Sequence, residues 1–291
     1  MKDIRERAVL VQFTDHIWRA NIADKAVSDE IATQKEVRNE NKNKVGSYRK
    51  SLIPKSALLD RRQIGNNARM YHYENTLPWM DGGIRILPAK SIAGYMTKMR
   101  HFKQKAAEAE ELFLNSYDKF KEEAKDVLGK LFNDADYPEK EVIKGKFLLD
   151  VVTFPVPEIK DWRVDIAQKD MDALRKEAMG NMMDIQKQAI MDLWKRLYEV
   201  LDKMNERLSA DEGVFRDSLV DNVTKMLDLL PVLNITDDKE LEKISKEVRL
   251  KLVKVSPAVL REDSAVRKQT AKDAQAILKK MDIYMKKGGA K

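Results

Sequence analysis

The sequence predicts a mainly α-helical protein, an elongated helical bundle with two long antiparallel helices and a small antiparallel β-sheet. Residues 88–132 and 167–208 repeat apolar residues at mostly three- and four-residue spacing, which is typical of amphipathic helices. Charged residues make up 35% of the 291 residues, with 11 glycines and 8 prolines, and this composition favours long helices that face solvent. Short stretches rich in β-branched residues predict the sheet.

The N-terminal part begins with a predicted strand. In residues 8–14, β-branched and aromatic residues partly alternate with polar ones, which is the period of a half-buried strand. Residues 24–44 are charged, carry a weak apolar stripe and predict a helix. Residues 44–74 predict two helices divided before Pro54, because the residue before a proline avoids the α conformation.

Residues 75–89 form the least helical passage in the middle of the chain, N-T-L-P-W-M-D-G-G-I-R-I-L-P-A. Gly82 and Gly83 indicate a turn, since glycine reaches a positive φ without a Cβ clash. Two interpretations are open: a hairpin-like latch packed in the core, or an exposed recognition loop. We favour the latch, because hydrophobic residues that flank a turn usually pack.

The two long predicted helices are joined by a predicted β region. A helix of the length of residues 88–132 would span about 67 Å at a rise of 1.5 Å per residue, so it needs a partner along its length. The simplest partner is the helix 167–208, folded back as an antiparallel pair. Between them, residues 147–153 and 162–166 predict strands that pair with the first strand. Four methionines of the second helix are expected to fill the core: Met179, Met182, Met183 and Met191.

The C-terminal third predicts three further helices. The first spans residues 214–230 and is stopped by Pro231, the second is capped near Asp237, and the last begins at Asp263 or Ser264. No internal repeat or low-complexity linker separates these helices from the rest. We therefore expect one elongated unit, in which residues 1–208 carry the long helices, sheet and basic segment, and helices in 209–291 pack on them.

Positive charge is concentrated in two segments of a chain whose formal net charge is +7. Residues 42–105 hold 14 Lys and Arg against 3 Asp and Glu, and residues 251–291 hold 11 against 4. Such segregation can attract a polyanion, or the acidic residues between the segments can neutralise it within the fold or between subunits. Tyrosines interleave with the first segment, as in single-strand nucleic-acid grooves. The same composition also suits a partly exposed helix whose long side chains cover a core. The candidate nucleic-acid-binding residues are Arg49, Lys50, Lys55, Arg61, Arg62, Arg69, Tyr71, Arg85, Lys98 and Arg100.

No motif points to catalysis. Cysteine is absent, which excludes disulfides and thiolate chemistry, and no glycine-rich phosphate loop is present. His16, His72 and His101 lack metal-ligand spacing, and Asp134 with Asp136 suits a turn better than a cation site. We expect no enzyme activity, cofactor or metal. No stretch approaches the ~18 apolar residues of a membrane span, so we expect a cytoplasmic protein without membrane contact.

Three segments resemble an uncharacterised family of phage and mobile-element proteins. They are residues 75–89, L-F-N-D-A-D-Y-P at 131–138, and F-P-V-P-E-I-K-D-W-R-V at 154–164. The genes of this family often neighbour those of MoxR-type AAA+ ATPases and von Willebrand A-type proteins. The resemblance covers roughly the first two thirds of the chain. The family has no established catalytic residues, so it implies an accessory role in a host cell and no mechanism.

The leading functional hypothesis is therefore a non-enzymatic phage accessory protein that binds nucleic acid through residues 42–105. The alternative is a protein-contact role: an oligomeric scaffold, an adaptor for an AAA+ ATPase, or a viral inhibitor of a host factor. Two long apolar stripes that a small fold does not fully bury motivate this alternative and predict a homo-oligomer. Trp79 and Trp162 are the candidate partner-binding residues.

Overall fold

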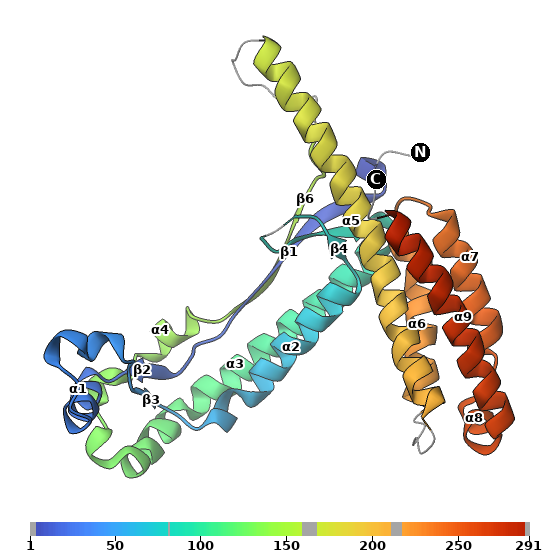
Figure 1. The fold of residues 1–291 in the computed structure, drawn as a ribbon. Helices are drawn as coiled ribbons and strands as arrows, with labels where there is room; N and C mark the ends of the chain where they lie inside the picture. Colours follow the sequence, from blue (N-terminus) through green and yellow to red (C-terminus); the bar gives the residue numbers. More distant parts are fainter. Residues whose placement is uncertain (1–3, 81, 159–167, 211–216, 289–291) are drawn as a thin grey trace. The chain divides into compact units, whose positions relative to one another are not determined.

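A computed structural model describes residues 4–80, 82–158, 168–210 and 217–288, and Figure 1 shows them as a mainly α-helical fold with a small antiparallel sheet. The α-helices are α1 (Lys25–Gln34), α2 (Leu59–Glu74), α3 (Ile92–Leu128), α4 (Lys140–Lys144), α5 (Gln168–Ser209), α6 (Ser218–Leu233), α7 (Lys239–Val248), α8 (Pro257–Glu262) and α9 (Ser264–Gly288). Short 3-10 helices are η1 (Ile4–Glu6), η2 (Asn39–Lys44), η3 (Lys55–Leu58), η4 (Ala89–Ser91), η5 (Gly129–Leu131) and η6 (Asp134–Asp136), and η8 (Arg249–Val253) is a π-helix.

The chain divides into two compact units. Unit 1 comprises residues 1–12, 72–95 and 152–291, and unit 2 comprises residues 13–71 and 96–151. This division does not follow a boundary at residue 208: the C-terminal helices pack with α5 in unit 1. The antiparallel pairing of α3 with α5 stays a prediction, because most of α3 belongs to unit 2 and α5 belongs to unit 1.

A four-stranded sheet has the order β4 (Leu77–Pro78), β5 (Ile84–Pro88), β1 (Ala8–His16) and β6 (Leu148–Phe154). β1 pairs antiparallel with β5, with Leu10 opposite Ile86, and β4 pairs antiparallel with β5. The latch predicted at residues 75–89 is confirmed as the β4–β5 hairpin, since Leu77 and Ile86 are fully buried and Gly82 and Gly83 take positive φ.

Trp79 follows β4 and is only 6% exposed, within the main hydrophobic core. The prediction of Trp79 as an exposed partner-binding residue is therefore wrong: apolar packing of the hairpin removes its indole from solvent. Trp162 and the predicted strand 162–166 lie outside the residues that the structure describes.

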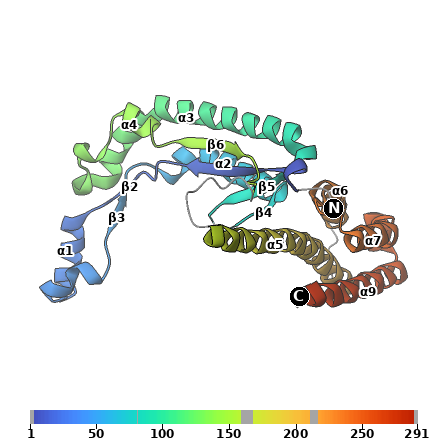
Figure 2. The ribbon, with the colours of Figure 1, turned by 90° about the horizontal axis from the view of Figure 1, so that it is seen from above.

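The helical core of unit 1 is organised around α5. α5 packs against α9 and α6, and α5 and α9 run side by side in both Figure 1 and Figure 2. Trp194 of α5 is fully buried, stacks on Tyr284 of α9 at 4.3 Å between ring centroids, and donates to the Asp238 carboxylate at 3.0 Å. Asp238 also caps the N-terminus of α7 by accepting from Glu240 and Leu241.

Unit 2 has its own apolar core, made by residues near α3 and by the segment around a second, two-stranded sheet. In this sheet β2 (Asn21–Ala23) pairs antiparallel with β3 (Arg49–Ser51). Trp18 lies 6.0 Å from Phe113 and 5.8 Å from Tyr117 between ring centroids. The buried members of this core are Trp18, Ala20, Leu52, Ile53, Leu58, Phe113, Tyr117, Ala124, Tyr137, Ile143 and Phe147.

Three local predictions are wrong. Residues 44–53 are not a helix, because Arg49–Ser51 pairs with β2 and Gly46 takes a φ of 124°. Pro231 does not stop the third C-terminal helix but lies inside α6, where helix packing outweighs the lost hydrogen bond. Met179 and Met183 are 52% and 65% exposed and do not fill the core.

Candidate nucleic-acid interface

Arg61 is buried, although the sequence suggested a nucleic-acid contact. Its side chain is 1% exposed, and its Nη1 and Nε donate to Asp15 at 2.9 Å and to Glu110 at 2.6 Å. Its Nη2 donates to the carbonyls of His16 and Leu148, both at 3.3 Å. A charge-assisted network of this kind satisfies a guanidinium inside a protein. Arg61 therefore joins β1, β6 and α3 to α2 and cannot contact a ligand.

Lys50 is buried as well. Its ammonium lies 2.7 Å from Asp136 and 3.2 Å from Asp24, and it donates to the carbonyl of Leu131 at 2.7 Å. The hydrogen bond to Asp136 is the main cause that raises the pKa of Lys50. Successive side chains of a strand point to opposite faces, so Lys50 points inward and Arg49 faces solvent. Neither Lys50 nor Arg61 is therefore available to nucleic acid.

Arg85 lies in unit 1 and is half-buried. It donates to the hydroxyl and carbonyl of Thr76 at 2.7 and 3.0 Å and lies over the Tyr73 ring at 4.6 Å. Arg196 of α5 donates to the same carbonyl at 2.8 Å and pairs with Asp192 at 2.7 Å. Burial, followed by the positive charge of Arg196, lowers the pKa of Arg85. The arginines hold the hairpin in place, so we assign Arg85 a structural role.

The predicted residues of α2 lie on opposite flanks. Arg69 is 3.5 Å from the Asp15 carboxylate and lies over the Phe13 ring at 5.7 Å. Tyr71 contacts the Phe102 ring of α3 at 6.1 Å. Positions two residues apart in a helix differ by about 200° in direction, so these two side chains serve different surfaces. Arg62, seven residues before Arg69, lies on the flank of Arg69.

The two predicted residues of α3, Lys98 and Arg100, also lie on opposite flanks of their helix. Lys98 is exposed and lies over the Phe102 ring at 5.3 Å, on the flank where Tyr71 lies. Arg100 is also exposed, but it shares the flank of Lys103, which pairs with Asp150 of β6 at 2.8 Å. The cations of α2 and α3 therefore do not form one surface.

Residues 19–58 of unit 2, which we call the β2–β3 segment, hold a different arrangement of charge. Between β2 and β3, the chain forms α1 and η2. The Asp24 N–H donates to the Tyr48 carbonyl at 3.0 Å and so joins the two ends of this connection. The Asp24 side chain caps α1 by accepting from Val27 at 3.1 Å. Lys50 and the apolar residues of the unit 2 core fasten the segment to its unit.

The outward cations of the β2–β3 segment have no carboxylate partner among the described residues. The segment holds nine Lys and Arg against five Asp and Glu, a net charge of +4. Among the described residues, Lys50 is the only one of these nine cations with an ion pair, to Asp24 and Asp136. Three of its cations donate to neutral oxygens: Lys42 to Thr33, Lys44 to Asn41 and Arg49 to Asn21. The outward cations are Arg19, Lys25, Lys35, Arg38, Lys42, Lys44, Arg49 and Lys55.

Of these eight cations, only Arg49 and Lys55 are among the residues predicted from the sequence. Lys42 and Lys44 lie within the basic segment 42–105, and Arg19, Lys25, Lys35 and Arg38 precede it. Two sequence signals were available for the missed residues. The run from Arg38 to Arg49 combines lysines, asparagines and Tyr48, and its only acidic residue is Glu40. A positive run that carries little acid and lies between short strands is a better indicator of an open cationic surface than the net charge of a long segment.

No cluster of three or more His, Asp or Glu side chains with metal-binding geometry occurs among the described residues. Of the helices that the structure describes, none has both the length and the apolar composition needed to cross a bilayer. Comparisons with protein-family models, with curated proteins and with solved structures gave no match.

Proposed function

We propose that this protein binds nucleic acid non-enzymatically and that the β2–β3 segment provides the contacts. One observation carries the proposal: eight outward cations of this segment have no carboxylate partner in the described chain. Outside the segment, several lysines pair with nearby acids, as Lys251 does with Glu247 at 2.9 Å. Cations left without internal partners are available to phosphates, and phosphate contacts supply most of the affinity of sequence-independent binding.

The anchoring of the segment supports the proposal. Lys50 and its two carboxylates hold β3 from the inside, so Arg49 is presented on a fixed backbone. Tyr48 is half-buried next to Arg49, and a tyrosine ring adds a stacking surface for an unpaired base. Lys98 and Arg100 are exposed but lie on opposite flanks of α3, so we propose no part for them in this interface.

The direct experiment is fluorescence anisotropy of the full chain with labelled single-stranded and double-stranded oligonucleotides. We expect binding at low salt whose affinity falls steeply as salt rises, with a slope of log affinity against log salt of roughly −0.7 to −0.9 per phosphate contacted. Absence of binding to DNA and RNA of either form at low salt would overturn the proposal.

A role in protein assembly is the second candidate, and one observation favours it. On α5, Leu174, Met179 and Met183 are 37%, 52% and 65% exposed. Methionine-rich surfaces adapt to varied partners. Light scattering of the purified chain tests this candidate: a mass above that of one chain supports the homo-oligomer, and a strict monomer without a co-purifying partner contradicts it.

The biological setting is a further part of the proposal. The resemblance of residues 75–89, 131–138 and 154–164 to phage and mobile-element proteins supports a role in the cytoplasm of a host cell. If the protein acts through protein contacts, the same resemblance supports an AAA+ ATPase or a host factor as its partner.

A further inference from the structure

The solvent face of the β2–β3 sheet carries four side chains. Asn21 lies opposite Ser51 and Ala23 lies opposite Arg49, and all four are exposed. Lys50 lies between two of them and points to the other face, where it is held by its carboxylates. Arg49 is the longest of the four outward side chains, and its neighbours on this face are short. A ligand can therefore approach the sheet closely and meet the guanidinium first.

Asn21 orients the Arg49 guanidinium. Nε and Nη2 of Arg49 donate to Asn21 Oδ1 at 3.1 and 2.7 Å, and Asn21 Nδ2 donates to the Arg19 carbonyl at 3.3 Å. These contacts use one edge of the guanidinium and leave the fork that Nη1 and Nη2 form at its tip. A guanidinium held in one orientation loses less entropy when it forms further hydrogen bonds.

The remaining fork matches the edge of one base. Guanine presents O6 and N7 in the major groove, and a bidentate arginine is the commonest specific contact with them. A phosphate accepts the same fork, but other cations of the segment can supply the phosphate contacts: Arg19 and Lys25 precede and follow β2, and Lys44 and Lys55 precede and follow β3. Phosphate contacts position a protein and base contacts specify the sequence, so Arg49 suits the second role.

The segment suits duplex DNA better than other forms of nucleic acid. The major groove of B-DNA, ~12 Å wide, admits a two-stranded β-ribbon, whereas the major groove of duplex RNA is deep and narrow. Single-strand sites stack successive bases on aromatic side chains. Tyr48 is the single aromatic residue of the segment, so stacking serves one unpaired base.

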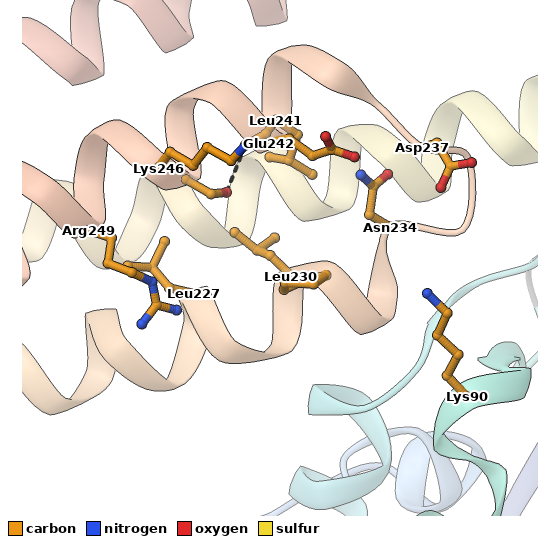
Figure 3. A pocket seen from close by; sticks show the side chains of 11 residues that line it. Lys90, Leu227, Leu230, Asn234, Asp237, Leu241, Glu242, Lys246 and Arg249 are labelled. Carbon is orange, nitrogen blue, oxygen red and sulfur yellow. Dashed lines mark hydrogen bonds between the residues drawn. The ribbon is translucent and has the colours of Figure 1, made fainter.

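A groove of about 390 Å³ between α6 and α7 in unit 1 has a different character (Figure 3). Asp237 and Glu242 line it together with cations, and Leu227, Leu230 and Leu241 in its lining are only 1–2% exposed. A polyanion meets acids there, and an apolar ligand meets little apolar surface. The solvent face of the β2–β3 sheet, in contrast, carries three neutral side chains and one cation.

We infer that the β2–β3 sheet lies in the major groove of duplex DNA, where Arg49 contacts guanine and Asn21 is its positioning residue. The inference rests on the proposed function, because it requires that the segment binds nucleic acid. It adds the form of the nucleic acid and the base that is read. The surrounding cations supply sequence-independent affinity, and Arg49 adds a preference for G·C pairs.

The test is fluorescence anisotropy of the full chain with modified DNA duplexes made of G·C pairs. 7-Deazaguanine lacks N7 in the major groove, whereas inosine lacks the N2 amino group in the minor groove. We expect 7-deazaguanine to weaken binding by about fivefold or more and inosine to leave it unchanged. The unmodified duplex should bind more tightly than an unstructured DNA single strand or an RNA duplex of equal length.

The outcomes separate this inference from the proposed function. Binding that 7-deazaguanine leaves unchanged, a loss with inosine instead, or tighter binding of the single strand or the RNA duplex overturns the inference and leaves the proposed function standing. Absence of binding to every one of these probes at low salt overturns both.

Three variants locate the contact. Arg49→Lys keeps the charge and removes the fork, and Asn21→Ala removes the acceptor that orients the guanidinium. Both should lose most of the difference in affinity between the guanine and 7-deazaguanine duplexes, with the salt slope unchanged. Asn39→Ala removes another exposed asparagine of the segment and should keep the difference. A full difference in Arg49→Lys, or an equal loss in Asn39→Ala, contradicts the role of Arg49.

Discussion

Arg61 donates to Asp15 at 2.9 Å inside unit 2, and both side chains are almost fully buried, at 1% and 6% exposed. Glu110 completes the pairing of the guanidinium at 2.6 Å. Although Arg61 belongs to a basic segment, its charge is used inside the fold. It holds a strand against two helices and is unavailable to any ligand.

Replacing Arg61 by methionine should destabilise the protein by about 3–5 kcal/mol, because Asp15 and Glu110 then lose the charge that compensates their burial. Urea unfolding followed by circular dichroism measures this change. Arg62→Met is the matched control, since Arg62 has no ion pair in the described chain, and it should stay within about 0.5 kcal/mol of the wild type. Equal effects of the two substitutions would contradict the account of the cluster.

Gly65 of α2 faces the same cluster. A Cβ added there would overlap the Asp15 carboxylate and lie 3.1 Å from Arg61 Nη1. Gly65→Ala should therefore destabilise the protein although alanine favours helix. Gly94 of α3 has nothing within 4 Å of its would-be Cβ, so Gly94→Ala should stabilise by up to about 1 kcal/mol. Thermal melting measures the stability of both variants. A stabilising Gly65→Ala would show that Gly65 does not lie close to the Asp15 carboxylate.

Asp24 predicts a pH dependence of stability. The Val27 N–H and then the Lys50 ammonium lower its pKa below the ordinary 3.8. The unfolded carboxyl has the higher pKa, so the stabilisation is complete above that value and is lost as pH falls through the folded-state pKa. Asp24→Asn keeps the capping oxygen and removes the charge. Its deficit in melting temperature should be largest near neutral pH and shrink at about pH 3. A deficit independent of pH would contradict the assigned contacts.

Tyr117 predicts a change at alkaline pH. Burial is the main cause that raises its pKa from 10.0 to about 12, and its hydroxyl donates to the carbonyl of Pro138 at 3.0 Å. The unfolded tyrosine ionises first, so the stabilisation is present below about pH 10 and is lost between roughly pH 10 and 12. The difference in tyrosinate absorbance between wild type and Tyr117→Phe should have its midpoint near the higher value. A midpoint at an ordinary tyrosine pKa would refute the burial of this hydroxyl.

The sequence predicted the elements whose patterns are long or chemically distinctive. A sustained apolar stripe predicted a helix over residues 167–208, and α5 spans Gln168–Ser209. The two glycines at 82 and 83 predicted the turn of the β4–β5 hairpin, because both adopt the positive φ that glycine permits. These signals are local, so tertiary contacts did not overrule them.

The candidate site was predicted less well, because the face of a side chain depends on partners far along the chain. Arg49 and Lys50 are neighbours of similar chemistry, yet Lys50 is buried by carboxylates at positions 24 and 136. Arg61 is buried by Asp15 and Glu110, 46 and 49 residues away. Composition counts all these cations alike, and only the fold distinguishes those with internal partners from those without.

The most direct measurement compares two triple charge reversals in the full chain by oligonucleotide anisotropy. One is Lys42→Glu, Lys44→Glu and Arg49→Glu in the β2–β3 segment. The other is Lys268→Glu, Lys272→Glu and Lys279→Glu on exposed positions of α9, with the same change in net charge. We predict that the first weakens nucleic-acid binding by at least about tenfold and lowers the salt slope by roughly 2 to 3, while the second has a small effect. Equal losses, or a larger loss from the α9 variant, would contradict the proposal that the β2–β3 segment is the interface.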